Sequence, residues 1–185
     1  MNSPTLENNR VRLAPLSLEN FGELSHIARE KNLIQYSPSD IETFEALEHY
    51  TTIAINLRDK KSAIPFIVYD KQKKAFAGCT RYMNIDWKNK NLEIGSTWIG
   101  RGFQGTGLNS EMKQLMLDYA FFTMDFEKIS FRIDERNEQS KKAVAKIGAI
   151  LEGVLRQDTY LLNGFKRNTC IYSILKDEWI ARNSK

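Results

Sequence analysis

The sequence predicts one domain of the α+β class, with mixed α/β character and a central, mostly antiparallel sheet. Three observations predict this class: short segments alternate apolar and polar residues, others repeat apolar residues every three to four positions, and the composition is that of a globular protein. The chain has 185 residues, of which 42% are hydrophobic, 11% aromatic and 27% charged. A chain of this length buries about 70% of the surface that its unfolded form exposes. We therefore expect residues 1–185 to form a single domain around one core.

The first half of the sequence predicts a strand, two helices and then three consecutive strands. The first strand, 11–16, ends beside a proline, and helical spacing follows over 18–29 with Ser17 as the N-cap. A second amphipathic helix covers 43–58. Three alternating segments come next, separated by polar, charged turns of the kind that join hairpins: 64–69, 75–84 and 91–99. These three strands are expected to form an antiparallel meander.

The second half begins with a glycine-rich loop, 100–107, which leads into a helix at 108–122. A strand at 128–134 follows that helix. Because this strand and 91–99 are connected through a helix, they are expected to pair in parallel by a right-handed crossover. The remaining elements are a short helix ended by Gly148 and two strands joined at Asn163-Gly164: 138–147, 150–162 and 169–175. The expected order is β-α-α-β-β-β-α-β-α-β-β.

The charge of the chain is mildly basic and unevenly distributed. The formal net charge is +4; residues 1–50 carry four basic and eight acidic side chains, which leaves 23 basic and 15 acidic side chains in the rest. The later basic residues are scattered, without the basic stripe and stacking aromatics of a nucleic-acid binder, so no nucleic-acid partner is expected. A basic portion suits an anionic ligand and an acidic portion a cationic one, although ordinary solvated faces produce the same pattern.

Neither a membrane segment nor a metal site is expected. The first ten residues lack an apolar stretch, and no run approaches the roughly 18 uncharged apolar residues that a spanning helix needs. Cys79 and Cys170 lie far apart in apolar stretches, which favours buried free thiols in a reducing, cytoplasmic setting. His26 and His49 stand alone on predicted helices, without companions for a metal or a catalytic triad.

The strongest local signal is the glycine-rich loop before the helix at 108–122. Gly105 and Gly107 free backbone N–H groups at the positive end of a helix dipole, which predicts a site for phosphate groups. The same segment also fits the dinucleotide spacing G-x-G-x-x-G, but four strands and two helices precede it, whereas a dinucleotide fold places this loop in its first βα unit. The third interpretation is that the glycine-rich loop only reverses the direction of the chain and binds no ligand.

Several motifs resemble one known family. Residues 104–111, Gln-Gly-Thr-Gly-Leu-Asn-Ser-Glu, resemble motif A of the GNAT acetyltransferase superfamily, [QR]-x-x-G-x-[GA], with Asn109 where Gly or Ala is usual. The similarity continues, in the same order as in the family, through 136–140, 146–149, 151–156 and 172–179. Within the superfamily the chain most resembles the Rim-type branch of ribosomal-protein N-terminal acetyltransferases.

This resemblance implies an acetyl-CoA site. In the family the strands equivalent to 91–99 and 128–134 splay apart and receive the pantetheine arm, which the backbone near Trp98 and Ile99 would hold. The resemblance assigns the pyrophosphate to the backbone of the loop, and places further cofactor contacts after the fifth strand: Gln104, Gly105, Thr106, Gly107, Leu108 and Asn109, then Asn137 and Ser140. Asn137 would serve equally as a plain helix N-cap. Lys141 and Lys142 are candidates for the 3′-phosphate or ordinary surface lysines.

The mechanism implied by the resemblance is direct attack of an amine on the thioester, without a covalent enzyme intermediate. Glu93 is the expected base, on the strand face opposite Leu92 and Ile94, acting directly or through water; the alternative is an exposed strand glutamate. The Ser140 hydroxyl is expected near the leaving sulfur. Tyr160 and Tyr172 are weaker candidates for a general acid, and core or edge positions explain them equally well.

The sequence thus predicts an acetyl-CoA-dependent N-acetyltransferase without a metal. The expected acceptor is a primary amine, with a protein or peptide N-terminus favoured by the Rim-type resemblance and a polyamine or amino-sugar as the alternative. A CoA-binding module without catalysis is a further alternative, because fold-level kinship does not establish the acceptor or the reaction. Both a monomer and a homodimer are compatible with the sequence.

Overall fold

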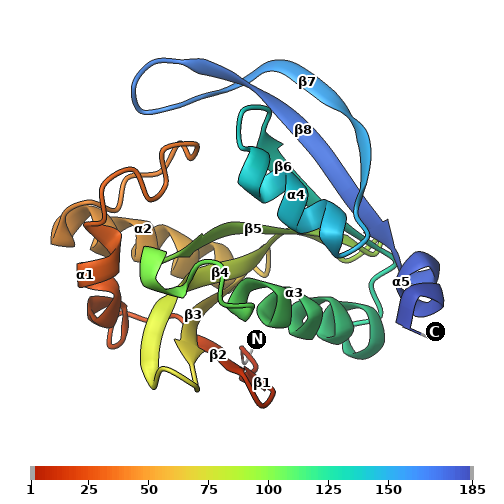
Figure 1. Ribbon diagram of the computed structural model, residues 1–185, viewed down its shortest axis with the longest axis horizontal. Helices are drawn as coiled ribbons and strands as arrows, with labels where there is room; N and C mark the ends of the chain where they lie inside the picture. The colour runs from red at the N-terminus through yellow and green to blue at the C-terminus, as the bar shows by residue number, and fades with distance from the viewer. Residues whose placement is uncertain (1–2, 184–185) are drawn as a thin grey trace.

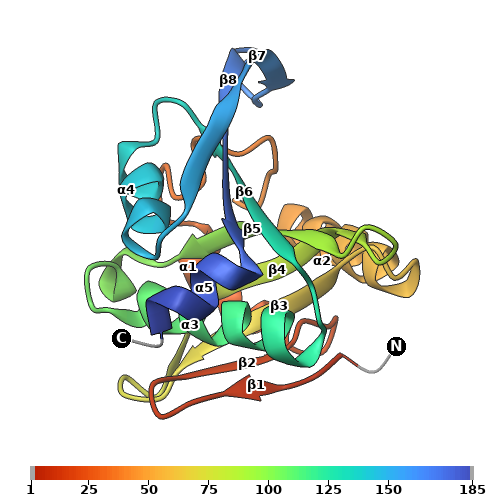
Figure 2. The same cartoon turned by 90° about the vertical axis from the view of Figure 1, so that its right-hand side faces the viewer.

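The computed structural model describes residues 3–183, which form one eight-stranded sheet with helices on both faces (Figures 1 and 2). The order across the sheet is β1-β2-β3-β4-β5-β6-β8-β7. The strands are β1 (Leu6–Glu7), β2 (Val11–Pro15), β3 (Ile64–Asp70), β4 (Ala75–Asp86), β5 (Asn91–Ile99), β6 (Lys128–Asp134), β7 (Ile150–Tyr160) and β8 (Lys166–Leu175). The α-helices are α1 (Ser25–Ala28), α2 (Phe44–Asp59), α3 (Leu108–Asp118), α4 (Glu138–Lys146) and α5 (Lys176–Asn183).

Two apolar clusters hold the layers together, one on each face of the sheet. The larger cluster joins α3, α4 and α5 to the strands and includes Met112, Met116 and Trp179. The smaller cluster lies under α1 and α2 and includes Leu47 and Trp98. No helix within residues 3–183 is long and apolar enough to cross a membrane.

The structure confirms the expected mixed fold and element order, and it departs from the expectation in local detail. The segment 18–29 forms a 3₁₀ turn, Phe21–Leu24, followed by the single α-helical turn α1. Its buried residues Phe21, Leu24 and Ile27 are spaced by three, which matches the period of a 3₁₀ turn. Within residues 3–183, one strand and one α-helix were not expected: β1, which has only two residues and therefore no measurable alternation, and α5, which follows β8 without a break. The predicted helix 108–122 ends as α3 at Asp118 and continues as a π-helical turn, Tyr119–Thr123.

The sheet is incomplete between β5 and β6. These strands pair in parallel, as expected, but only at Asn91–Lys128, Leu92–Ile129 and Glu93–Ser130. Beyond Glu93, β5 pairs with β4 alone, and β6 pairs with β8 alone. The strands therefore splay apart toward the end of β5, where the chain enters the glycine-rich loop.

Candidate functional site

The gap between β5 and β6 is bordered by a distorted stretch of β5. The register with β4 shifts between the pairs Arg81–Gly95 and Cys79–Trp98, and Ser96 adopts a left-handed φ of 46° in the resulting bulge. The Tyr50 hydroxyl donates to the Ser96 carbonyl at 3.3 Å. A bulge aims backbone groups away from the ladder, so the last residues of β5 have backbone available to a ligand in the gap.

The glycine-rich loop lies directly after β5 and before α3. Gly105 and Gly107 have φ angles of +73° and +86°, and a Cβ on either would meet no atom within 4 Å. The first hydrogen bond of α3 runs from the Glu111 amide to the Gly107 carbonyl at 3.1 Å, so the amides before it have no intrahelical acceptor. This open, amide-lined cradle fits a pyrophosphate.

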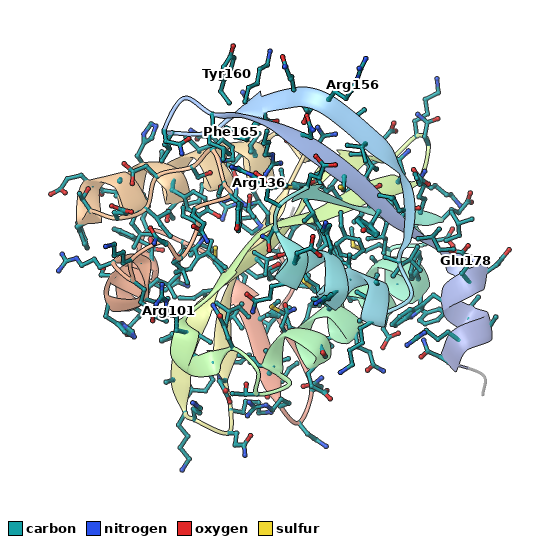
Figure 3. All side chains as sticks on the ribbon, turned by 45° about the horizontal axis from the view of Figure 1, so that its top comes forward. Arg101, Arg136, Arg156, Tyr160, Phe165 and Glu178 are labelled. Carbon is teal, nitrogen blue, oxygen red and sulfur yellow. The ribbon has the colours of Figure 1, made fainter. Side chains whose placement is uncertain are left out.

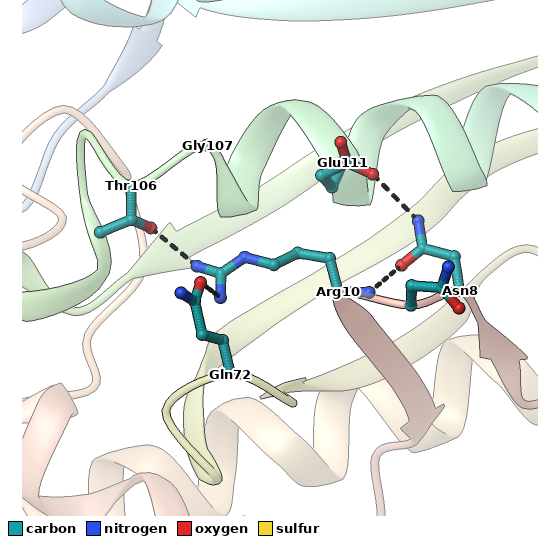
Figure 4. Close-up of a pocket in the computed structure, with 7 residues that line it drawn as sticks. Asn8, Arg10, Gln72, Thr106, Gly107 and Glu111 are labelled. Carbon is teal, nitrogen blue, oxygen red and sulfur yellow. Dashed lines mark hydrogen bonds between the residues drawn. The ribbon is translucent and has the colours of Figure 1, made fainter.

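Three side chains from other elements hold the loop in place. Arg10 donates to Thr106 Oγ1 at 3.2 Å (Figure 4). The same guanidinium pairs with the buried carboxylate of Asp70 at 2.8 Å. Lys73 donates to the Gly102 carbonyl at 2.5 Å, and Glu30 accepts from the Arg101 amide at 2.8 Å. A cavity of about 550 Å³ lies beside the contact between Arg10 and Thr106. It is lined by Asn8, Asn9, Arg10, Gln72, Thr106, Gly107 and Glu111.

The residues expected to bind the cofactor gather around the gap, although not all through their side chains. The Trp98 side chain is buried, with its indole N–H pointing to the Tyr50 hydroxyl, and Leu108 is also buried, so both offer only backbone to the site. The Gln104 side chain donates to the Ile99 carbonyl at 2.9 Å and closes the loop onto β5. Asn109 lies half-buried in the first turn of α3.

Across the gap, Asn137 and Ser140 lie at the start of α4. Asn137 is the N-cap of this helix, and its Oδ1 accepts from the Ser140 amide at 3.0 Å, which is the capping role considered as the alternative. The Ser140 hydroxyl is half-buried. Lys141 pairs with Glu138 at 2.6 Å, whereas Lys142 is exposed. The amides of Asn137, Glu138 and Ser140 thus already have acceptors within the chain, so a ligand at the start of α4 would meet side chains rather than a row of free amides.

Glu93 is buried, with 7% of its surface exposed, at the last paired position before the strands separate. Leu92 and Ile94 enter the larger cluster, so Glu93 projects from the opposite face, as strand alternation predicts. Burial raises the pKa of the Glu93 carboxyl, and a 2.8 Å hydrogen bond from Asn84 opposes this shift. A carboxylate with a raised pKa is a better proton acceptor than an exposed one.

A cavity of about 260 Å³ adjoins Glu93 on the sheet face from which Glu93 projects, which we call the Glu93 face. It is lined by Asn84, Asn91, Leu92, Glu93, Ser130, Arg132 and Ile171. Arg132 pairs with Asp158 at 2.6 Å. Arg167, on β8, donates to the Tyr36 carbonyl at 2.6 Å and so ties the segment between α1 and α2 to the β7–β8 hairpin.

Arg136, which follows β6 in the sequence, makes two further contacts. The Arg136 guanidinium lies 3.9 Å from the Phe165 ring centroid, and the two residues are labelled in Figure 3. The Arg136 side chain also pairs with Asp134 at 2.6 Å. Tyr160 is 64% exposed and points outward, so the structure does not bring this candidate acid to Glu93 (Figure 3). Tyr172 is half-buried against the larger cluster.

One functional candidate escaped the sequence analysis. Lys113, on α3, is 6% exposed, and its Nζ donates to Thr97 Oγ1 of β5 at 2.9 Å and lies 5.8 Å from the Phe131 ring centroid of β6. It therefore contacts both strands that separate. Burial lowers the pKa of Lys113 to about 7. In the sequence, only its position beside Met112 and Met116, on the apolar side of the predicted helix, could have indicated that Lys113 is buried. Cys79 and Cys170 are free and buried, as expected.

The sequence matches the family described as the acetyltransferase (GNAT) domain over residues 10–150. The chain belongs to the GNAT acetyltransferase family. The resemblance inferred from the loop and its companion motifs is thereby confirmed, and so is the assignment to acetyltransferases.

The relatives of this GNAT chain differ in their named acceptors. YdaF of Bacillus subtilis (strain 168), provisionally named a ribosomal N-acetyltransferase, is 30% identical over 105 residues, which are 57% of this chain and 56% of that protein. The chain therefore spans just over half the length of this relative. Spermidine N(1)-acetyltransferase of Escherichia coli (strain K12) is 24% identical over 94% of this chain and 90% of its own length. Among solved structures, a GCN5-related N-acetyltransferase from Brucella melitensis superposes with a TM-score of 0.90 at 24% identity, over 100% of this chain and 84% of that one.

Proposed function

We propose that this protein transfers the acetyl group of acetyl-CoA to an α-amine, with the N-terminus of a protein or peptide as the favoured acceptor. The observation that carries the proposal is the gap in the sheet, which opens between the glycine-rich loop on one side and Glu93 on the other. A ligand that lies along β5 would have its anionic end at the loop and its reactive end beside Glu93. The resemblance to the Rim-type branch and the name of YdaF support the choice of acceptor.

The residues of the chain fit acetyl-CoA, which supplies the activated acetyl group as a thioester. Amides at Gly105, Thr106 and Gly107 would hold the pyrophosphate, because no side chain fills the space in front of the two glycines. Backbone N–H groups near Trp98 and Ile99 would stabilise the negative charge that develops on the thioester oxygen. One such donor is commonly worth about 10²-fold to 10³-fold in rate. The Ser140 hydroxyl would donate to the departing sulfur.

Glu93 would accept the proton of the attacking amine, directly or through a water in the adjoining cavity. The free energy needed to deprotonate the acceptor at pH 7 depends on the pKa of its amine. A lysine-like amine of pKa about 10.4 costs about 4.6 kcal/mol to deprotonate at pH 7, whereas an α-amine of pKa about 8 costs about 1.4 kcal/mol. One buried carboxylate beside a small cavity suits the second case better.

The test is the variant Glu93→Gln with acetyl-CoA and a panel of peptide N-termini, polyamines and amino-sugars. We expect unchanged acetyl-CoA affinity by calorimetry and a pH-dependent loss of thiol release. Rates equal to those of the unmodified protein at every pH would remove Glu93 from the mechanism. Binding of acetyl-CoA without thiol release on any acceptor would favour a CoA-binding module without catalysis. Thiol release with polyamines alone would show that the acceptor is a polyamine and not an α-amine.

A further inference from the structure

Lys113 is a buried amine that no carboxylate compensates. It is almost completely buried, and it forms no ion pair within residues 3–183. A protonated lysine has three N–H donors, and one of them is used on the Thr97 hydroxyl. A lysine that is desolvated in this way loses its proton near neutral pH, and its neutral amine is a nucleophile. The proposed mechanism does not use this group.

The amine of Lys113 contacts both strands that border the gap in the sheet. Its Nζ donates to Thr97 Oγ1 of β5 at 2.9 Å and lies 5.8 Å from the Phe131 ring centroid of β6. Phe131 is the first residue of β6 beyond Ser130, where the pairing with β5 ends. Lys113 therefore lies near the narrow end of the gap. The thioester of acetyl-CoA would lie close by, because Thr97 precedes the backbone N–H groups that would hold the thioester oxygen.

Lys113 and Glu93 approach the gap from opposite faces of the sheet. Phe131 belongs to the larger apolar cluster together with α3, whereas Glu93 projects from the other face. Thr97 also faces α3, although strand alternation would place it on the Glu93 face, because the bulge at Ser96 shifts the alternation. A planar thioester that lies between the strands would present one side to Glu93 and the other side to Lys113.

In the part of the chain that the structure describes, no other charge restores the ordinary pKa of Lys113. Burial is the sole cause that lowers this pKa to about 7. Glu111 of α3 binds Asn8, and Asp118 of α3 binds the Trp179 indole N–H. The titratable side chains of the surrounding elements, none of which contributes to this pKa, are Tyr82, Glu93, Glu111, Asp118, Tyr119, Lys141, Cys170 and Tyr172. About half of the Lys113 side chains are therefore neutral at pH 7.

We propose, on the basis of the function proposed above, that bound acetyl-CoA acetylates Lys113 when no acceptor amine is present. The neutral Nζ attacks the thioester carbon, so that a C–N bond forms and the C–S bond breaks. The sulfur leaves with the electron pair of the C–S bond and takes one proton from the nitrogen, which gives N-acetyl-lysine and CoA. Because the product is an amide, the acetyl group stays on Lys113. It should occupy the narrow end of the gap and hinder the binding of the next acetyl-CoA.

The experiment incubates the full chain with acetyl-CoA that carries a deuterated acetyl group, without any acceptor. Peptide mass spectrometry follows the deuterated acetyl group on Lys113 and on Lys146, an exposed lysine in the last turn of α4 that serves as the internal control. At about pH 7.5 we expect Lys113 to react about a hundredfold faster, because an ordinary lysine of pKa about 10.4 is almost entirely protonated. The rate at Lys113 should level off above about pH 8, whereas the rate at Lys146 should continue to rise toward about pH 10.

Two variants distinguish transfer from the bound cosubstrate from acetylation by acetyl-CoA in solution. Gly107→Val, which is expected to weaken acetyl-CoA binding, should slow the reaction of Lys113 at least tenfold at low acetyl-CoA and leave Lys146 unchanged. Lys113→Arg keeps a cation but offers no amine. After prolonged incubation with acetyl-CoA and removal of the nucleotide, calorimetry should show weakened acetyl-CoA binding in the unmodified chain and unweakened binding in Lys113→Arg.

An unacetylated Lys113 in a protein that binds acetyl-CoA by calorimetry would overturn this inference and leave the acetyltransferase proposal intact. Equal rates at Lys113 and Lys146 would also overturn it, and so would a Lys113 rate that Gly107→Val does not change, because the acetyl group would then come from solution. If calorimetry showed no binding of acetyl-CoA, both proposals would fail together.

Discussion

Asn84 Nδ2 donates to Glu93 Oε2 at 2.8 Å across the antiparallel pair β4–β5. Asn84 adopts a left-handed φ of 51°, which asparagine tolerates better than most residues. The bond stabilises the charged form of the carboxylate and so limits how far burial raises the pKa of Glu93. Asn84 on β4 thereby lowers the pKa of the proposed base on β5.

Replacing Asn84 with glycine should move the acid limb of the pH–rate profile. Asn84→Gly keeps the left-handed backbone but removes the donor, so the pKa of Glu93 should rise further and the limb of kcat/KM should shift to higher pH. The profile is measured with one acceptor between pH 5 and 9. Asn89→Gly, in the exposed turn between the same strands, is the control. An unmoved limb would show that Asn84 does not tune Glu93.

Replacing Lys113 with methionine should stabilise the fold near neutral pH. Since burial lowers the pKa of Lys113 to about 7, the unfolded chain binds more protons than the folded one between about pH 7 and its ordinary value. The cost of burying the charged Lys113 lowers the free energy of unfolding by its full amount below pH 7. This cost decreases as the pH rises from about 7 toward the ordinary pKa of lysine. Lys113→Met should therefore raise the free energy of unfolding at pH 6 by on the order of 1–3 kcal/mol.

The gain from Lys113→Met should shrink toward pH 10, which denaturant unfolding at several pH values would measure. Lys142→Met, on an exposed position of α4, should give no pH-dependent gain. A loss of stability at pH 6 would mean that the hydrogen bond to Thr97 and the Phe131 contact outweigh the cost of burying the ammonium.

Replacing Gly107 with valine should weaken acetyl-CoA binding with a small loss of stability. The added side chain would cover the amides of the loop, and the left-handed backbone would cost about 1–2 kcal/mol. Calorimetry should show at least a tenfold higher Kd. Gly102→Val, in the same loop but without a left-handed φ, is the control and should bind nearly normally. Wild-type affinity in Gly107→Val would refute the phosphate site.

Replacing Arg10 with methionine should loosen the glycine-rich loop. The change removes the bond to Thr106 and leaves the fully buried Asp70 without its cation. We expect a higher KM for acetyl-CoA with little change in kcat, and a stability loss of about 1–3 kcal/mol. Arg12→Met, two residues further along the chain in β2 and exposed over Tyr69, should leave KM unchanged. An unchanged KM in Arg10→Met would show that the loop holds its shape alone.

Local patterns allowed the element order, the loop and the face of Glu93 to be predicted, because each depends on residues close in sequence. The burial of Lys113, Arg81 and Arg167 could not be predicted in this way. Charged side chains are expected at the surface, and these three are buried only because distant segments pack over them: α3 on β5 and β6, α2 on β4, and the segment near Tyr36 on β8. The site residues that sequence patterns miss are thus the ones that tertiary packing creates.

The three residue pairs that join β5 to β6 have a consequence for the energetics of the whole fold. The backbone groups of residues 94–99 that face the gap lack a strand partner, so their amides should exchange hydrogen readily in the free protein. A bound donor that occupies the gap protects them and stabilises only the folded state. At a donor concentration of 100 times Kd, this linkage adds about 2.7 kcal/mol to the unfolding free energy. The resistance of the protein to heat and proteolysis should therefore follow the supply of its own cosubstrate.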